Sequence, residues 1–484
     1  MTVTRARLLV VFAAGLAATA AAQDPDREWL AGDSHIHSHW SPGYDRSQNP
    51  PLPLKGEDAI YPTPINAQMA QKFGLSWMVT TDHGGPNHSK FNMEQAYPEL
   101  QASRTLVPDV LQFYGMEINL PGMDHHTLII PRSAAEAAAL LDIESRFDAN
   151  DAWPPAPERH SEAAAVEALR HMRGLSPLPL MFANHPSRSA KAIGVYGLDE
   201  PRELRRNHDA APEVYRGMEG APGHQAGGLA PDGSPKRNAA GEPVGARGSY
   251  GNPGAGTFGG FDQMTAVVGG LWDSLLGEGR RFWIVASSDS HVHYSETPRS
   301  GSDFWPGEFH KTYVLARKTY EDVLDGLRDG RVFAVAGGLI TELEVEARAG
   351  RARAGLGGTL PAAKGGKVKV RVRFRDPAAP NARGDRPSVS RVDVIVGDLL
   401  GPGGDPTADK NPSTRVVARV DRGRWKQKGE WREFDITLPA LGRSAYVRLR
   451  GTNTADLEPL MDAAGENPWL ELWFYSNPVF IDVR

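Results

Sequence analysis

The sequence predicts an α/β domain followed by a smaller all-β domain, with the division near residue 340. Before that residue, short apolar segments alternate with segments of helical periodicity, whereas after it apolar and polar residues alternate with a period of two. Alternating strands and helices favour an α/β barrel or a doubly wound sheet, and period-two alternation is typical of half-buried antiparallel strands. We therefore assign residues 23–340 to the α/β domain and residues 341–484 to a β-sandwich-like domain.

Short apolar segments indicate the strands of the first domain, because buried parallel strands have this character. They are residues 75–81, 110–118, 127–131, 178–183 and 282–287. Segments with helical periodicity complete the alternation: residues 65–73, 162–172 and 262–276, with an alanine-rich helical insert at 133–147. Residues 219–260 are rich in Gly and Pro and lack a periodic apolar pattern. A segment of that length is either disordered or functional, and we expect a lid or rim element.

The strands expected in the second domain alternate apolar with charged residues. They are residues 367–374, 391–396, 415–420, 432–438, 446–450 and 470–474. Their basic residues are most simply the solvent-facing side of a small β-sandwich, although a surface that binds anionic partners is an alternative.

The N-terminus predicts export. Arg5 and Arg7 precede an apolar stretch at residues 8–18, and Ala20, Ala21 and Ala22 offer a small-residue cleavage site. This pattern is typical of a secretory signal peptide over residues 1–22, and it predicts a periplasmic or secreted protein. The apolar stretch is short for a membrane span, and no later segment is longer, so we expect no stable span. An uncleaved anchor is the alternative.

Composition excludes several classes of protein. The net charge of -5 argues against a general nucleic-acid binder, which would carry a basic surplus. The absence of cysteine excludes disulfides and thiolate metal ligands. The length suits two or three domains, and the oligomeric state is not determined by any of these features.

Six short segments contain likely metal ligands, several of them directly after an expected strand. Their candidate side chains are His35, His37, Asp82, His83, Glu117, His125, His126, His185, Asp289 and His291. Histidine and carboxylate without cysteine suit zinc, manganese or iron. Each residue alone is more often structural, but the set at strand ends predicts a metal cluster, since enzymes with parallel sheets place their chemistry there.

Local spacing supports this interpretation. His35 and His37 are two residues apart, so on a strand both side chains point to the same face. Asp289 and His291 repeat that spacing after the expected strand at 282–287. Glu117 ends a strongly apolar segment, where a carboxylate is costly unless it is paired or binds metal.

These motifs resemble those of the PHP (polymerase and histidinol phosphatase) superfamily over roughly residues 31–340. The matching motifs are His35-Ile36-His37, Thr81-Asp82-His83, Gly115-Met116-Glu117, His126, His185-Pro186 and Asp289-Ser290-His291. The resemblance implies a distorted (β/α)7 barrel that hydrolyses phosphoesters at two or three divalent metals, commonly zinc, manganese or iron. It also suggests an exported member with an extra C-terminal β-domain.

The resemblance further implies a ligand set. One metal would be held by His35, His37, Glu117 and Asp289, and a second by Glu117, His126 and His185. His83 and His291 would face a third metal, whose remaining ligand is either His39 or Asp45. His125 is the alternative to His126, which directly precedes the apolar segment 127–131 as the family histidine does. Asp82 is a ligand, an orienting residue or a proton acceptor.

The resulting functional expectation is an exported metal-dependent phosphodiesterase that acts on small organic phosphate esters. A metal-bridging hydroxide would attack the ester, with Asp82, Glu117 and His185 as catalytic residues. Arg188 and Lys311 are the candidate substrate-binding cations. The alternatives are a phosphomonoesterase, a metal-dependent hydrolase of amides or other esters, and a non-catalytic binding protein.

Overall fold

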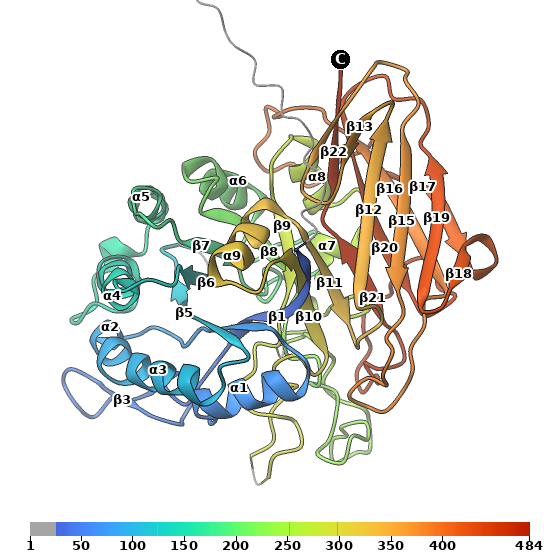
Figure 1. Cartoon of the computed structure of the whole chain (residues 1–484). Coiled ribbons are helices and arrows are strands. Elements are labelled where there is room, and N and C mark those ends of the chain that lie inside the picture. Colours follow the sequence, from blue (N-terminus) through green and yellow to red (C-terminus); the bar gives the residue numbers. More distant parts are fainter. Residues whose placement is uncertain (1–25, 123, 251, 298) are drawn as a thin grey trace, which may run out of the picture.

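The computed structural model describes residues 26–484, except residues 123, 251 and 298. The expected signal peptide at residues 1–22 lies outside the described residues. The chain forms a large mixed sheet, a second antiparallel sheet of five strands, and helices gathered around the first part of the large sheet (Figure 1). Within the described ranges, no helix is both long and apolar enough to cross a membrane.

Seven consecutive neighbours of the large sheet carry the candidate site. They are β1 (Glu28–Ile36), β4 (Trp77–Thr80), β5 (Leu111–Asn119), β6 (His125–Ile130), β7 (Leu180–Ala183), β8 (Tyr215–Ala221) and β9 (Trp283–Ala286). Pairing is parallel except at β6, which is antiparallel to both neighbours. An isolated parallel bridge between Ile36 and Ser290 brings the segment after β9 back to the end of β1. The end of β1, the first of these seven strands, therefore lies beside the segment that follows β9, the last of them.

The helices lie around these strands (Figure 1). They are α1 (Thr63–Lys72), α2 (His88–Phe91), the π-helix η1 (Asn92–Ala96), α3 (Tyr97–Leu106), α4 (Glu136–Phe147), α5 (Glu162–Arg173), α6 (Pro201–Ala210), α7 (Gln263–Ala266), α8 (Leu271–Gly277) and α9 (Tyr320–Asp329). The single helix expected at residues 262–276 is wrong, because it is divided into α7 and α8. Gly269 between them has φ +78°, a left-handed conformation that interrupts a right-handed helix.

Short elements complete the first part of the chain. They are the hairpin of β2 (Gly43–Asp45) and β3 (Leu52–Leu54), and the 3₁₀ turns η2 (Pro157–Arg159) and η3 (Pro253–Ala255). On the other side of β1 the large sheet continues antiparallel through β10 (His310–Ala316) and β11 (Val332–Ala336).

The C-terminal strands divide between the two sheets. The five-stranded sheet contains β12 (Glu342–Ala349), β13 (Ala352–Ala354), β15 (Lys369–Arg375), β18 (Lys426–Lys428) and β19 (Trp431–Thr437). The large sheet gains β14 (Thr359–Ala362), β16 (Arg391–Asp398), β17 (Arg415–Asp421), β20 (Ala445–Thr452), β21 (Trp473–Ser476) and β22 (Val479–Val483), and the 3₁₀ turn η4 (Arg422–Arg424) follows β17.

The large sheet runs without a break across residue 340. β21 pairs with β11 on one side and with β20 on the other. The apolar faces of both sheets also belong to the same buried cluster as the first strands. The division into two domains at residue 340 therefore stays a prediction, while the physical connection between the two regions is extensive.

Candidate metal centre

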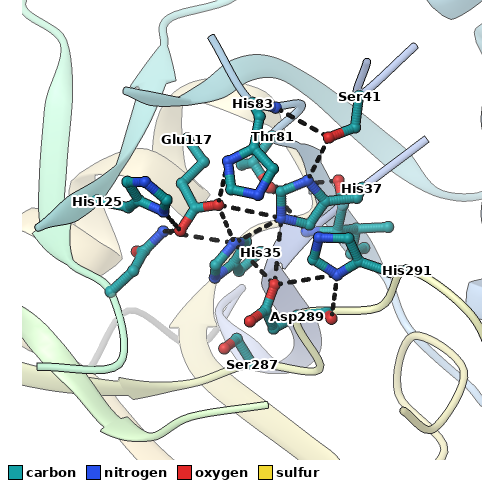
Figure 2. Close-up of polar contacts among 12 residues, drawn as sticks. His35, His37, Ser41, Thr81, His83, Glu117, His125, Ser287, Asp289 and His291 are labelled. Atoms are coloured by element: carbon teal, nitrogen blue, oxygen red, sulfur yellow. Dashed lines mark hydrogen bonds and ion pairs between the residues drawn. The ribbon is translucent and has the colours of Figure 1, made fainter. Parts of the chain in front are cut away.

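Histidines and carboxylates from separate strands converge at the ends of the seven strands. His35 lies in β1, Glu117 in β5 and His125 in β6, whereas the other members follow strands or lie in loops. Figure 2 shows His35, His37, His83, Glu117, His125, Asp289 and His291 pointing toward one another. The complete set comprises His35, His37, Asp58, His83, Glu117, His125, His185, His224, Asp289 and His291. Strand ends thus position the site, as parallel sheets generally do.

The deepest group combines two imidazoles with two carboxylates: His35, His37, Glu117 and Asp289. The Nε2 atoms of His35 and His37 are 2.9 Å apart, and each is 3.1 Å from Asp289 Oδ1. Glu117 Oε2 lies 3.4 Å from His35 Nε2 and 3.3 Å from His37 Nε2. Around a tetrahedral ion with bonds of about 2.0 Å, ligand atoms are about 3.3 Å apart. These spacings therefore fit one bound metal.

A second group uses Asp58, which precedes α1 and which sequence reasoning did not identify. Asp58 Oδ2 is 3.8 Å from His83 Nε2 and 3.4 Å from His291 Nε2. With His37, these three residues form a set whose ligand atoms lie within 4.8 Å of one another. Asp58 thus occupies the place for which His39 and Asp45 were the candidates. His39 instead pairs with Glu99 at 2.8 Å, and Asp45 is half-buried in β2 and accepts hydrogen bonds from Ser47.

Glu117 joins a third group on its other side. Its Oε2 lies 3.0 Å from His83 Nδ1, and its Oε1 lies 3.3 Å from His125 Nδ1 and 2.9 Å from His185 Nε2. One carboxylate therefore contacts imidazoles of all three groups. Asp289 is shared in the same manner, because it also forms a group with His224 and His291. Shared carboxylates are suited to holding two metal ions close together.

Neighbouring side chains fix which imidazole nitrogen faces the cluster. His35 Nδ1 lies 2.8 Å from Glu219 Oε1, and His37 Nδ1 lies 3.1 Å from Ser41 Oγ. Each ring thereby presents Nε2 to the deepest group. Glu219 also accepts hydrogen bonds from Ser287 Oγ and the backbone N–H of His185. Orienting partners of this kind are typical of metal-binding histidines.

Two members of the cluster, Glu117 and His37, have the charge that a metal ligand needs. Burial alone would raise the pKa of Glu117, but the imidazoles of His35, His83 and His125 hold that pKa well below its usual range. Burial and the nearby His291 lower the pKa of His37 to about 4, so this ring is neutral near pH 7 and offers a lone pair. An anionic carboxylate beside a neutral imidazole is the form in which both residues bind metal.

Several buried ligand atoms lack a hydrogen-bond partner. Glu117 Oε2, Asp289 Oδ1 and His125 Nδ1 belong to this set. A buried charged oxygen without a hydrogen bond is costly, so such atoms call for an explanation. Divalent metals supply one, since they would coordinate the two carboxylate oxygens that face the imidazoles. The residues present therefore fit bound metal ions.

The outer side of the cluster reaches solvent, while the inner side does not. The side chains of His35, His37, Glu117 and Asp289 are at most 2% exposed. Those of Asp58, His83, His125 and His291 are 34%, 23%, 20% and 15% exposed. A small substrate could thus approach the cluster from the side of Asp58 and His83.

The structure places His125, and not the predicted His126, in the cluster. Both ring nitrogens of His126 are engaged elsewhere: Nδ1 with the Asp124 carbonyl at 3.0 Å and Nε2 with the Tyr215 hydroxyl at 3.1 Å. Because neighbouring residues of a strand point to opposite faces, only one of the two histidines can turn toward Glu117. The choice of His126 as a ligand is corrected accordingly.

Asp82 and Lys311 also lie outside the cluster. The Asp82 carboxylate accepts hydrogen bonds from Ser38 N and Ser38 Oγ, at 2.6 and 2.9 Å, and so holds the turn that follows His37. Lys311 donates to the Phe73 carbonyl at 2.6 Å and lines a groove of about 1030 Å³ between β10 and β12. Asp82 is therefore a structural support and not a ligand, and Lys311 faces away from the site.

Arg188 remains beside the centre, because it forms an ion pair with Asp124, the residue before His125. The Arg188 side chain is 31% exposed, and the charges of Asp124 and Glu117 raise its pKa against the effect of burial. A permanently charged fork in this position can contact an anionic substrate.

A scan against protein-family models gives no match for this chain, and a search of curated proteins gives none either. The resemblance to the PHP superfamily therefore depends on the ligand motifs and the buried cluster that they form. That cluster establishes a site compatible with metal-dependent hydrolysis.

Proposed function

We propose that the protein is a metal-dependent phosphoester hydrolase that acts on small phosphodiesters. The observation that carries the proposal is the sharing of Glu117 and Asp289 between adjoining groups of ligand atoms. Bound divalent ions in such a site would lower the pKa of a coordinated water and neutralise charge on phosphoryl oxygens. Zinc, manganese and iron all suit the His and carboxylate donors.

The chain's own residues have separate roles in this proposal. Glu117 and Asp289 would hold the metal ions, and Glu219 and Ser41 orient the imidazoles of His35 and His37 that would join them as ligands. The exposed side of Asp58, His83 and His291 receives the ester. Arg188 contacts a phosphoryl oxygen and orients the ester for in-line attack.

Charge balance favours diesters over monoesters. A diester carries one negative charge at neutral pH, whereas a monoester carries close to two. Arg188 is already paired with Asp124, so it offers little additional positive charge for a second phosphate charge.

The fold proposal is linked to this function. We propose that β1, β4, β5, β6, β7, β8 and β9 form the distorted (β/α)7 barrel implied by the family resemblance. The bridge between Ile36 and Ser290 supports this proposal, as does the convergence of ligands at the strand ends. The expected export to the periplasm or medium remains a part of the proposal that depends only on the N-terminal sequence.

Paired substrates test the function. The full chain would be reconstituted with Zn²⁺, Mn²⁺ or Fe²⁺ and assayed with bis(p-nitrophenyl) phosphate, p-nitrophenyl phosphate and p-nitroanilide amides. We expect hydrolysis of the diester to be fastest, with Arg188→Ala reducing the rate on both phosphates. Protein that carries at least two metals per chain but hydrolyses neither phosphate would contradict the proposal, and faster amide hydrolysis would assign a different reaction.

A further inference from the structure

The long segment between β8 and α7, residues 222–262, reaches the metal centre. The Tyr250 hydroxyl donates a hydrogen bond to Asp289 Oδ2 at 3.0 Å. The Tyr250 ring lies 4.9 Å from the ring of His185 and 4.4 Å from that of His224. A Cβ on Gly223 would be 2.2 Å from Asp289 Cβ, so the first turn of this segment also touches the ligand. The segment therefore forms one wall of the centre.

Unusual backbone conformations occur where this segment meets the metal centre. Residues other than glycine with positive φ in the described chain are Asn87, His185, His224, Tyr250 and Asp289, with φ between 28° and 56°. Four of these five belong to the centre or to the segment that covers it. Such conformations cost about 1 to 3 kcal/mol each and persist only where surrounding contacts impose them. Something must therefore hold Tyr250 in place.

The C-terminal region supplies that restraint through Asp462, which lies between β20 and β21. Its carboxylate is 2.8 Å from Arg247 Nε, and both side chains are fully buried. It also accepts hydrogen bonds from Thr257 Oγ1 at 2.5 Å and from the N–H groups of Gly259 and Gly260 at 2.9 and 3.0 Å. One carboxylate thus fixes the chain on both sides of Tyr250.

Further hydrogen bonds reinforce this clamp, by which Asp462 holds Arg247 and residues 257–260. The Asp462 N–H donates to the Thr257 carbonyl at 2.8 Å, and the Gly465 N–H donates to the Gly245 carbonyl at 2.8 Å. Arg247 Nη1 donates to the Pro468 carbonyl at 2.9 Å. Residues 462–468 therefore contact both Gly245 and Arg247, before Tyr250, and residues 257–260, after it.

We propose that Asp462 is a positioning residue of the metal centre, acting through Arg247 and residues 257–260 to hold Tyr250 on Asp289. The Tyr250 hydrogen bond occupies Asp289 Oδ2 and fixes the carboxylate so that Oδ1 faces His35 and His37. The C-terminal region thereby completes a site whose ligands all come from the first part of the chain. This inference rests on the proposed metal site and is independent of the reaction assigned to it.

Asp462→Asn in the full chain tests the clamp, with Asp273→Asn as the matched control. Asp273 pairs with Arg448, and both of their side chains are also fully buried, but the other partners of this carboxylate are Gly269 and Tyr446, which lie outside the segment at residues 222–262. We expect both variants to lose thermal stability. Only Asp462→Asn should weaken Zn²⁺ affinity, measured by chelator competition, by about 10- to 100-fold, which is the usual effect of losing an orienting partner. It should also speed hydrogen exchange in residues 245–262 of metal-free protein.

Tyr250→Phe tests the end of the same chain of contacts without disturbing the fold. We expect its melting temperature to equal that of the wild type in the metal-free state, while its Zn²⁺ affinity falls in the direction of Asp462→Asn. Unchanged Zn²⁺ affinity in Tyr250→Phe, or equal affinities in Asp462→Asn and Asp273→Asn, would overturn the inference. Weaker Zn²⁺ binding in Tyr250→Phe, with a wild type that hydrolyses no phosphate ester, would support the clamp and reject the reaction.

Discussion

The metal centre and the outer face of β12, β15 and β19 are both densely charged, but their charges are compensated differently. On the outer face, the strand register places arginines opposite glutamates, as with Arg373 opposite Glu344 and Glu433. These side chains are partly exposed and paired, with Arg373 Nη1 2.6 Å from Glu344 Oε2. In the centre, Glu117 Oε2 and Asp289 Oδ1 are buried and have no hydrogen-bond partner.

The charges of the two regions therefore differ in what they can do. Those of the outer face interact with solvent and with one another, whereas those of the centre can bind metal ions. An exposed ion pair contributes about 0.2 to 1 kcal/mol and is screened by salt. A buried carboxylate oxygen that accepts no hydrogen bond is costly, and a bound cation would offset that cost. The pairing of these arginines with glutamates also favours a solvent-facing role for the basic strands over an anion-binding one. The buried centre is therefore the region where substitutions should affect function most.

Glu117→Gln should produce the largest effect. The amide keeps the shape but loses the negative charge that contacts imidazoles on both sides. We expect metal content to fall by at least one ion per chain, and kcat/KM on bis(p-nitrophenyl) phosphate to fall about 1000-fold or more, which is about 4 kcal/mol. Elemental analysis and steady-state kinetics measure the two quantities.

Glu344→Gln is the matched control, because it removes the same charge from the outer face. It should leave metal content and kcat/KM unchanged. If Glu117→Gln kept its metals and its turnover, Glu117 would not be a metal ligand, and the two regions would not differ in the way described.

Metal removal should have the next largest effect. A ligand that binds only the folded state at 100 times its Kd stabilises that state by about 2.7 kcal/mol. We expect a chelator to lower the melting temperature of the wild type by several degrees and to have little effect on Glu117→Gln. Calorimetry with and without the chelator measures this, and an unchanged wild-type melting temperature would show that the buried carboxylates need no metal.

The sequence predicted best those parts whose pattern is set by burial. β4, β5, β7 and β9 are apolar because both of their faces are covered, and each was found within two residues of its expected ends. β1 and β8 were not expected as strands. They contain Asp33, His35 and Glu219, the polar residues that serve the centre, and these interrupt the apolar pattern.

The candidate site was predictable to the same degree. Glu117 lies in the expected strand β5, and the two-residue spacing of His35 and His37 puts both rings on one side of the chain, so the three residues meet as expected. Asp58 and His224 come from irregular segments, where no periodicity links sequence to position. The choice between His125 and His126 failed because residues 126–130 of β6 are buried on both faces, so the pattern does not reveal which face is inside.

His208 is a buried histidine outside the metal centre, and its protonation should lower the stability of the fold. This residue on α6 is buried, and its Nδ1 lies 3.3 Å from Arg280 Nη1. Burial, with the charges of Arg280 and Arg216, lowers the pKa of His208 to about 4. The unfolded chain, with a pKa of about 6.5, takes up the proton first, so the stability present above pH 6.5 is lost as the pH falls toward 4.

His208→Gln should remove this acid sensitivity. Between pH 7 and pH 4, the wild type should lose up to about 3 kcal/mol more unfolding free energy than the variant loses. Urea unfolding at several pH values measures it, and other titrating groups cancel because both proteins contain them. A difference that stays constant with pH would mean that His208 is protonated to the same extent in both states.

The Arg373–Glu344 pair should give the smallest effect. Arg373 also lies over the Trp431 ring at 4.4 Å and 3.5 Å from Glu433, so Arg373→Ala alone would remove packing as well as charge. A double-mutant cycle with Glu344→Ala isolates the pair, and we expect a coupling free energy below about 1 kcal/mol that falls further in 0.5 M NaCl. Turnover on bis(p-nitrophenyl) phosphate should not change in any of the three variants, because the pair belongs to a sheet that contributes no ligand. A coupling above about 2 kcal/mol, or a loss of turnover, would show that charge on this face serves more than solubility.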